Sequence, residues 1–134
     1  MNKKIVSVIC TVFLMVLAIS GNVHASAGKG AGGDITGSWK PKDASAGIGK
    51  ITFHEDGTFE MDVQDKGRTD LWGVYSILGK NLTLTNKRGR VHPSCYGLGM
   101  YEYAVSGKEL KYNPISDRCV PRVKSFKSVW QKVS

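Results

Sequence analysis

The chain has 134 residues and a formal net charge of +8, from 19 Lys and Arg residues against 11 Asp and Glu residues. This length supports one domain with a modest core, and the sequence shows no second domain, coiled coil or internal repeat, which excludes multidomain and fibrous proteins. The positive charge favours anionic partners only weakly, because many exported proteins are basic for solubility.

Residues 1–25 have the pattern of a secretory signal peptide. Lys3 and Lys4 give a positive start, residues 5–19 are almost wholly apolar, and Val23-His24-Ala25 resembles a cleavage site. The apolar run is shorter than the ~20 residues that a membrane span needs, and a retained anchor is the alternative. We expect a mature protein that begins at Ser26, carries a net charge of +6, has no integral membrane segment, and is periplasmic or secreted.

Residues 26–34 are small, glycine-rich and without a side chain suited to a core, so they predict a flexible leader. They lack the preceding strand and the Gly-Lys-Ser/Thr ending of a phosphate-binding loop. Residues 35–134 are then the folded domain.

The folded domain alternates apolar and polar residues, which is typical of strands with one buried face. Phe59 and Met61, for example, alternate with Glu60 and Asp62. The pattern predicts eight strands, at residues 35–40, 48–54, 58–63, 70–78, 81–86, 97–105, 109–113 and 124–133. Gly73 interrupts one of them and predicts a kink or bulge of the kind that curves a barrel.

The connections alternate in length, which indicates how the strands are arranged. The second, fourth and sixth are tight turns, whereas residues 41–47, 64–69, 87–96 and 114–123 form long loops. In an up-and-down barrel, odd connections share one end and even connections the other. We therefore predict an all-β fold, a single eight-stranded antiparallel up-and-down barrel with one plain end and one elaborate end.

The barrel interior is either filled by side chains or just wide enough for one small ligand. The side chains expected to face inward include several aromatic ones. They are Phe53, Phe59, Met61, Tyr101, Tyr103 and Leu110.

Cys95 and Cys119 are the two cysteines that remain after the signal peptide. In an exported protein they predict a disulfide. The barrel order places both at the elaborate end, which permits the pairing. The alternative is a thiol nucleophile assisted by His92, three residues before Cys95.

The long loops carry more cations than anions, so we expect a positive mouth that binds the charged end of an amphipathic, anionic ligand. The candidate ligand-binding residues are Arg88, Arg90, His92, Arg122, Tyr101 and Tyr103. The alternative is that these charges are ordinary solvated loop residues. Asp117 and Arg122 either pair and order their loop or line the mouth.

The domain resembles the lipocalin-like, or calycin, proteins in Gly37-Ser38-Trp39, Gly73-Val74-Tyr75 and the terminal Trp130. The resemblance implies a barrel that binds a small hydrophobic molecule and has Trp39 as the plug of one end. Lipocalins cover this Trp with an Arg, for which Lys132 is the nearest candidate by position. Avidins begin similarly, but Pro41 stands where they place a ligand-binding Asn, which argues against biotin binding.

We therefore predict an exported, non-enzymatic protein that binds a small hydrophobic or amphipathic, anionic molecule. The alternatives are a protein-interaction module, such as an inhibitor of an exported hydrolase, and a barrel isomerase or cyclase. The sequence has no catalytic arrangement and no metal-ligand set, so we expect no cofactor and no metal. Export argues against a nucleic-acid partner.

Overall fold

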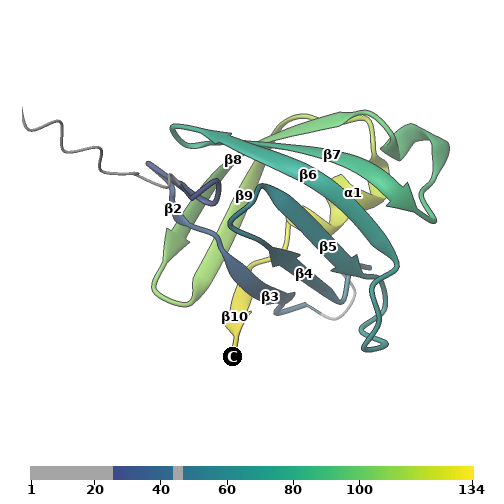
Figure 1. Ribbon diagram of the computed structural model, residues 1–134, viewed down its shortest axis with the longest axis horizontal. Coiled ribbons are helices and arrows are strands. Elements are labelled where there is room, and N and C mark those ends of the chain that lie inside the picture. The colour runs from purple at the N-terminus through teal and green to yellow at the C-terminus, as the bar shows by residue number, and fades with distance from the viewer. Residues whose placement is uncertain (1–25, 44–46) are drawn as a thin grey trace, which may run out of the picture.

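A computed structural model describes residues 26–43 and 47–134, and its main feature is a closed antiparallel barrel of eight strands (Figure 1). The order around the barrel is β10-β3-β4-β5-β6-β7-β8-β9, so every neighbour in sequence is a neighbour in space. This confirms the predicted up-and-down fold, and the proposed signal peptide lies outside the described residues. The barrel strands are β3 (Gly37–Pro41), β4 (Lys50–Phe53), β5 (Thr58–Asp62), β6 (Leu71–Leu78), β7 (Asn81–Gly89), β8 (Leu98–Ser106), β9 (Glu109–Ser116) and β10 (Trp130–Val133).

Large side chains fill the barrel interior, as alternation along the strands requires. Several aromatic rings in the interior contact one another; Phe126 stacks on Tyr112 with centroids 4.4 Å apart, and its ring meets Trp130 edge-on at 5.7 Å. The six residues expected to face inward are all buried. The largest side chains that are essentially inaccessible to solvent are Trp39, Trp130, Tyr101, Tyr103, Phe53, Phe59 and Phe126.

Gly73 curves the barrel wall at the point where the sequence predicts a bulge. The register between β6 and β7 shifts between Trp72 and Gly73. On the other side, Gly73 pairs with Phe59 of β5, and the Phe59 ring lies over the glycine. A Cβ atom at this position would be 2.3 Å from that ring. The strand therefore needs glycine here for packing as well as for curvature.

Residues 26–34, which we expected to be a flexible leader, have regular structure. They form a hairpin of β1 (Lys29–Gly30) and β2 (Gly33–Asp34), which lies at the end of the barrel opposite helix α1 (Figure 1). The backbone of Ala31 donates to Gly79 O at 2.9 Å, and Gly32 O accepts from Val105 N at 2.7 Å. The absence of bulky side chains, which suggested flexibility, is what lets this backbone lie directly on the tight turns.

The prediction of a last strand over residues 124–133 is wrong in its first half. Residues Val120–Phe126 form the short helix α1, and β10 begins only at Trp130. Pro121 occupies the first turn of the helix, where its missing N–H costs nothing. Seven residues are too few to show the hydrophobic period of a helix. Phe126 and Trp130 are both buried, and two buried residues four positions apart fit one face of a strand as well as one face of a helix.

Trp39 is fully buried and its indole Nε1 donates to Ile35 O at 2.7 Å, just before β3 begins. The ammonium group of Lys132 lies 5.3 Å from the centroid of the Trp39 ring. Lys132 pairs with Trp39 in the β10–β3 register and takes the covering position proposed for it.

We predict that Gly73→Ala lowers the free energy of unfolding by about 1–3 kcal/mol, because the new methyl group overlaps the Phe59 ring and Thr85 O. Gly97→Ala is the matched control, since a Cβ atom there meets nothing within 4 Å. Urea denaturation of both variants measures the difference. Equal midpoints for the two would contradict the packing described here.

Candidate functional site

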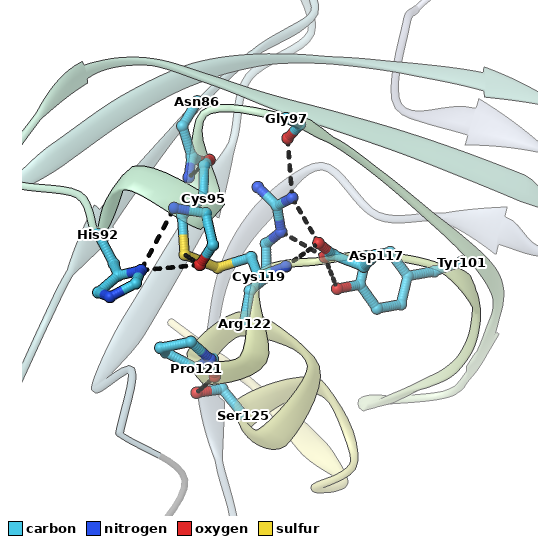
Figure 2. The surroundings of a disulfide bond; sticks show 11 residues. Asn86, His92, Cys95, Gly97, Tyr101, Asp117, Cys119, Pro121, Arg122 and Ser125 are labelled. Carbon is cyan, nitrogen blue, oxygen red and sulfur yellow. Dashed lines mark hydrogen bonds and ion pairs between the residues drawn. A yellow bond between two sulfur atoms is a disulfide. The ribbon is translucent and has the colours of Figure 1, made fainter.

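The elaborate end of the barrel is organised by the disulfide between Cys95 and Cys119, which confirms the predicted pairing. Cys95 ends η2 (Pro93–Cys95), a short 3-10 helix between β7 and β8, and Cys119 immediately precedes α1. Both residues are buried. The bond therefore ties the loop after β7 to the helix at the open end (Figure 2).

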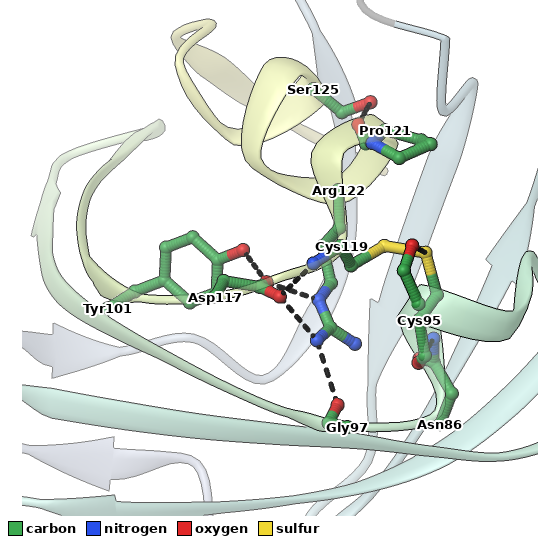
Figure 3. Close-up of polar contacts among 10 residues, drawn as sticks. Asn86, Cys95, Gly97, Tyr101, Asp117, Cys119, Pro121, Arg122 and Ser125 are labelled. Atoms are coloured by element: carbon green, nitrogen blue, oxygen red, sulfur yellow. Dashed lines mark hydrogen bonds and ion pairs between the residues drawn. A yellow bond between two sulfur atoms is a disulfide. The ribbon is translucent and has the colours of Figure 1, made fainter.

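A buried ion pair lies beside the disulfide. Arg122 of α1 donates from Nε to Asp117 Oδ2 at 2.6 Å and from Nη2 to Asp117 Oδ1 at 2.9 Å (Figure 3). Their side chains are only 2% and 1% exposed. Asp117 also accepts hydrogen bonds from the Tyr101 hydroxyl and the backbone N–H of Cys119. The expected pairing of Asp117 and Arg122 is confirmed, and Arg122 also lines the pocket described below.

The surroundings keep both members of the pair charged. Burial by itself would raise the pKa of Asp117, but hydrogen bonds from Arg122 and Tyr101 hold it below its ordinary value. Burial would lower the pKa of Arg122, and Asp117 raises it instead. Burial and the Asp117 carboxylate together raise the pKa of the Tyr101 hydroxyl, which stays protonated and donates.

Gly99 of β8 provides the space for this pair. A Cβ atom there would be 2.4 Å from Asp117 Oδ2 and 2.8 Å from Arg122 Nη2. Arg122 Nη2 also donates to Gly97 O at 3.0 Å. The start of β8 thus forms the backbone wall against which the ion pair rests.

An apolar pocket of about 250 Å³, here called the mouth pocket, also lies beside the disulfide. It is lined by side chains of the barrel interior, by the two cysteines and by α1. The lining includes Met61, Leu71, Asn86, Arg90, Cys95, Cys119, Arg122 and Lys124. Larger hollows exist on the outside, such as one of about 510 Å³ beside residues 63–70, but charged and polar residues dominate its lining.

Two residues that line the mouth pocket each have one buried polar atom without a hydrogen-bond partner among the described residues. The atoms are Oδ1 of Asn86 and Nη1 of Arg122, and both side chains are at least nine-tenths buried. Three other buried polar atoms are also without a partner among the described residues, away from this pocket: the Ser26 and Tyr112 hydroxyls and Trp130 Nε1. All five atoms are inaccessible to water.

The structure brings some of the predicted site residues together and separates others. Arg90, His92 and Arg122 all line the mouth pocket. Tyr101 lies behind it, bound to Asp117. Arg88 stacks over the Trp72 ring on the outer wall, with its guanidinium carbon 4.6 Å from the ring centroid, because β7 extends to Gly89.

Tyr103 lies at the opposite end from the mouth pocket, where its hydroxyl donates to Gly33 O at 2.9 Å. Asn86 was not a candidate in the sequence. The alternation in β7 contains the signal that identifies it: Leu82, Leu84 and Asn86 occupy successive inward positions, and only Asn86 is polar.

His92 has a structural role that its position explains. Its Nδ1 accepts from the backbone N–H of Ser94 at 3.2 Å and contacts the Ser94 hydroxyl at 2.8 Å, which caps η2. Because Nδ1 is the acceptor, Nε2 carries the proton in the neutral ring. Cys95 is in the disulfide, so the alternative of a thiol nucleophile assisted by His92 does not hold in this structure.

Within residues 26–43 and 47–134, no group of three or more His, Cys, Asp or Glu side chains is arranged to hold a metal ion. In the same part of the chain, no helix is long and apolar enough to cross a membrane.

Comparisons with models of protein families, with characterised proteins and with solved structures find no match to this chain.

We predict that Asp117→Asn lowers the free energy of unfolding at pH 7 by about 3–5 kcal/mol, because it leaves Arg122 charged and buried without its partner. The folded-state pKa of Asp117 is lowered, so its contribution is present above the ordinary value of 3.8 and is lost as the pH falls through the folded value. The variant should lack this loss on the acid side. Urea denaturation between neutral and acid pH measures both effects.

Asp65→Asn is the matched control, because Asp65 is exposed and pairs with Lys40 at the surface. We expect it to cost no more than about 1 kcal/mol. A similar cost for both variants would show that the Asp117–Arg122 pair does not stabilise the fold.

Proposed function

We propose that this protein is an exported, lipocalin-like binding protein that holds a small amphipathic molecule in the mouth pocket. The observation that carries the proposal is an apolar pocket beside the disulfide at the open end of the barrel, with the exposed cations Arg90 and Lys124 in its lining. Sites for small molecules are typically apolar, with a few polar groups that fix orientation.

The size of the pocket limits the ligand. An apolar cavity of about 150 Å³ binds benzene. The mouth pocket, at about 250 Å³, therefore suits a molecule with one substituted ring or a short chain. Below it, Phe126, Tyr112 and Trp130 fill the interior, so a long acyl chain has no path into the barrel.

The charges around the pocket support an anionic outer end on this ligand. Arg90 and Lys124 are exposed and line the pocket, whereas the charge of Arg122 is already balanced by Asp117. An anion is thus best placed at the exposed rim, next to Arg90 and Lys124, where it also keeps much of its hydration. The disulfide and the signal-like first 25 residues support export.

A second candidate function, docking of an acidic protein, is supported by exposed apolar side chains around the disulfide. Tyr96 and Val120 are 56% and 72% exposed, and each follows one of the bonded cysteines. Leu98 and Ile115 are also exposed and lie on neighbouring strands. Arg118, exposed between Ile115 and Val120, adds positive charge, and the whole chain is basic, which favours an acidic partner such as an exported hydrolase.

For binding in the mouth pocket, we predict that phenylacetate produces saturable shifts in heteronuclear NMR spectra at residues 90–95 and 121–125. Arg90→Gln with Lys124→Gln should weaken this binding by about tenfold, because the anion loses both rim cations. Lys66→Gln with Arg68→Gln removes the same charge from another loop and is the control. Shifts that do not saturate, or equal weakening by both pairs, would refute a site at the mouth.

For the second candidate function, we predict that a photo-crosslinking residue in place of Leu98 captures an acidic protein in an extract of the exported fraction. With that protein purified, Ile115→Gln should weaken its binding by about tenfold or more, as loss of a central apolar contact does. Val74→Gln, on the outer face of β6, is the control. Cross-links only between copies of this chain, or equal binding by both variants, would contradict an acidic partner.

A further inference from the structure

Exposed apolar side chains surround the disulfide at the open end of the barrel. Tyr96 and Val120 each follow one of the bonded cysteines. Leu98 begins β8, and Ile115 lies next to the end of β9. All four side chains are more than half exposed. Leu98 also lines an outer hollow together with Arg118, so apolar and cationic side chains are neighbours on this surface.

Helix α1 presents both kinds of side chain on its outer face. Arg122 and Phe126 are buried, which fixes the inner face of the helix. Val120 and Lys124 are exposed and four positions apart, so they lie one above the other on the outer face. The exposed Lys127 continues this row at the C-cap. The helix thus offers solvent one aliphatic side chain and two ammonium groups.

The two ends of the barrel also differ in charge. At the open end, residues 42–43, 47–49, 63–70, 90–97 and 117–129 connect the strands, and they carry eight Lys and Arg residues against four Asp residues. At the other end, the β1–β2 hairpin and the tight turns, residues 26–36, 54–57, 79–80 and 107–108, carry three charges of each sign. The excess positive charge of the connections is therefore confined to the open end (Figure 1).

Most of these cations are not used within the fold. Lys42 and Arg122 pair with acidic side chains, and Arg68 lies 3.5 Å from Asp70. The remaining ones are exposed and have no ion-pair partner among the described residues. They are Lys66, Arg90, Arg118, Lys124 and Lys127. Their charge is available to an anionic partner.

We propose that the open end of the barrel docks on an anionic lipid surface. Leu98, Ile115 and Val120 enter the interfacial layer, and the unpaired cations contact the headgroups. Peripheral proteins combine these two contributions, burial of apolar side chains and attraction of Lys and Arg to anionic lipids. The inference goes beyond the proposed function and does not depend on it. Docking in this orientation turns the mouth pocket toward the lipid, where amphipathic molecules accumulate.

The composition of this surface favours lipid over the acidic protein of the second candidate function. The energetically important residues of protein interfaces are mostly Trp, Tyr and Arg, and Leu, Val and Lys are under-represented there. Apart from Tyr96, the exposed apolar side chains here are aliphatic, and three of the unpaired cations are Lys. A fluid lipid surface contacts such separate side chains without a matching shape.

The test measures binding of the mature, disulfide-bonded protein to lipid vesicles by sedimentation. Vesicles of phosphatidylglycerol and phosphatidylcholine in equal parts are compared with vesicles of phosphatidylcholine alone. We expect at least about tenfold tighter binding to the anionic vesicles at low salt, and weaker binding as salt screens the charges. A spin-labelled lipid should broaden the NMR signals of residues 96–98 and 118–124, and leave those of residues 55–57 and 79–80 sharp.

One pair of substitutions tests the apolar contribution. Leu98→Gln with Val120→Gln should weaken binding to the anionic vesicles by about tenfold, because both side chains lose their burial in the interfacial layer. Val74→Gln with Leu78→Gln, two exposed apolar positions of β6, is the matched control and should bind like the wild-type protein.

A second pair tests the charge. Arg118→Gln with Lys127→Gln should also weaken binding by about tenfold, because two cations leave the headgroup layer. Lys80→Gln with Lys108→Gln removes the same charge from the turns of the other end and should have little effect.

Three outcomes would overturn the inference. Absent or equal binding to the two kinds of vesicle would refute an anionic lipid surface. Full binding by Leu98→Gln with Val120→Gln would make the open end a general site for polyanions. Cross-linking of an acidic protein at residue 98, without vesicle binding, would assign this surface to the second candidate function. The phenylacetate titration tests the mouth pocket separately, so the proposed function does not fall with this inference.

Discussion

The buried ion pair between Asp117 and Arg122 is the interaction on which the open end of this barrel depends. It links the residue that follows β9 to the first turn of α1, and two hydrogen bonds join the pair directly. A pair this buried is stable only when its other polar atoms are satisfied. Tyr101, Cys119 and Gly97 satisfy most of them, and Arg122 Nη1 remains without a partner among the described residues. The ion pair therefore fixes the helix whose residues also line the mouth pocket.

The two ends of the barrel are closed in different ways. At one end, the glycine-rich hairpin β1–β2 lies on the tight turns and closes the barrel with backbone hydrogen bonds. At the other end, the disulfide and Phe126 fix α1, and the mouth pocket remains beside them. Aromatic side chains fill the space between the ends. Of the two expectations for the interior, a filled barrel is therefore the one observed, and the pocket we propose for ligands is at the mouth.

The sequence predicted the barrel well because its information is local: alternation marks the strands, and the alternating connection lengths determine the arrangement. It also predicted the disulfide and the bulge at Gly73. It did not predict α1, since a seven-residue helix is too short for the hydrophobic periodicity by which a helix is recognised in a sequence. It placed Arg88 in the mouth because a run of charges resembles a loop, whereas these residues continue β7 on its solvent face. Asn86 was detectable only as a polar residue at an inward position.

Native mass spectrometry of the mature protein purified from its own host is the most direct measurement of whether the mouth pocket holds a ligand. The account predicts a disulfide-bonded protein that carries one small molecule, released on collisional activation and containing an acid and an apolar body. A bare protein, with no bound molecule at any collision energy, would contradict a small-molecule site and leave the apolar surface around the disulfide as the functional region.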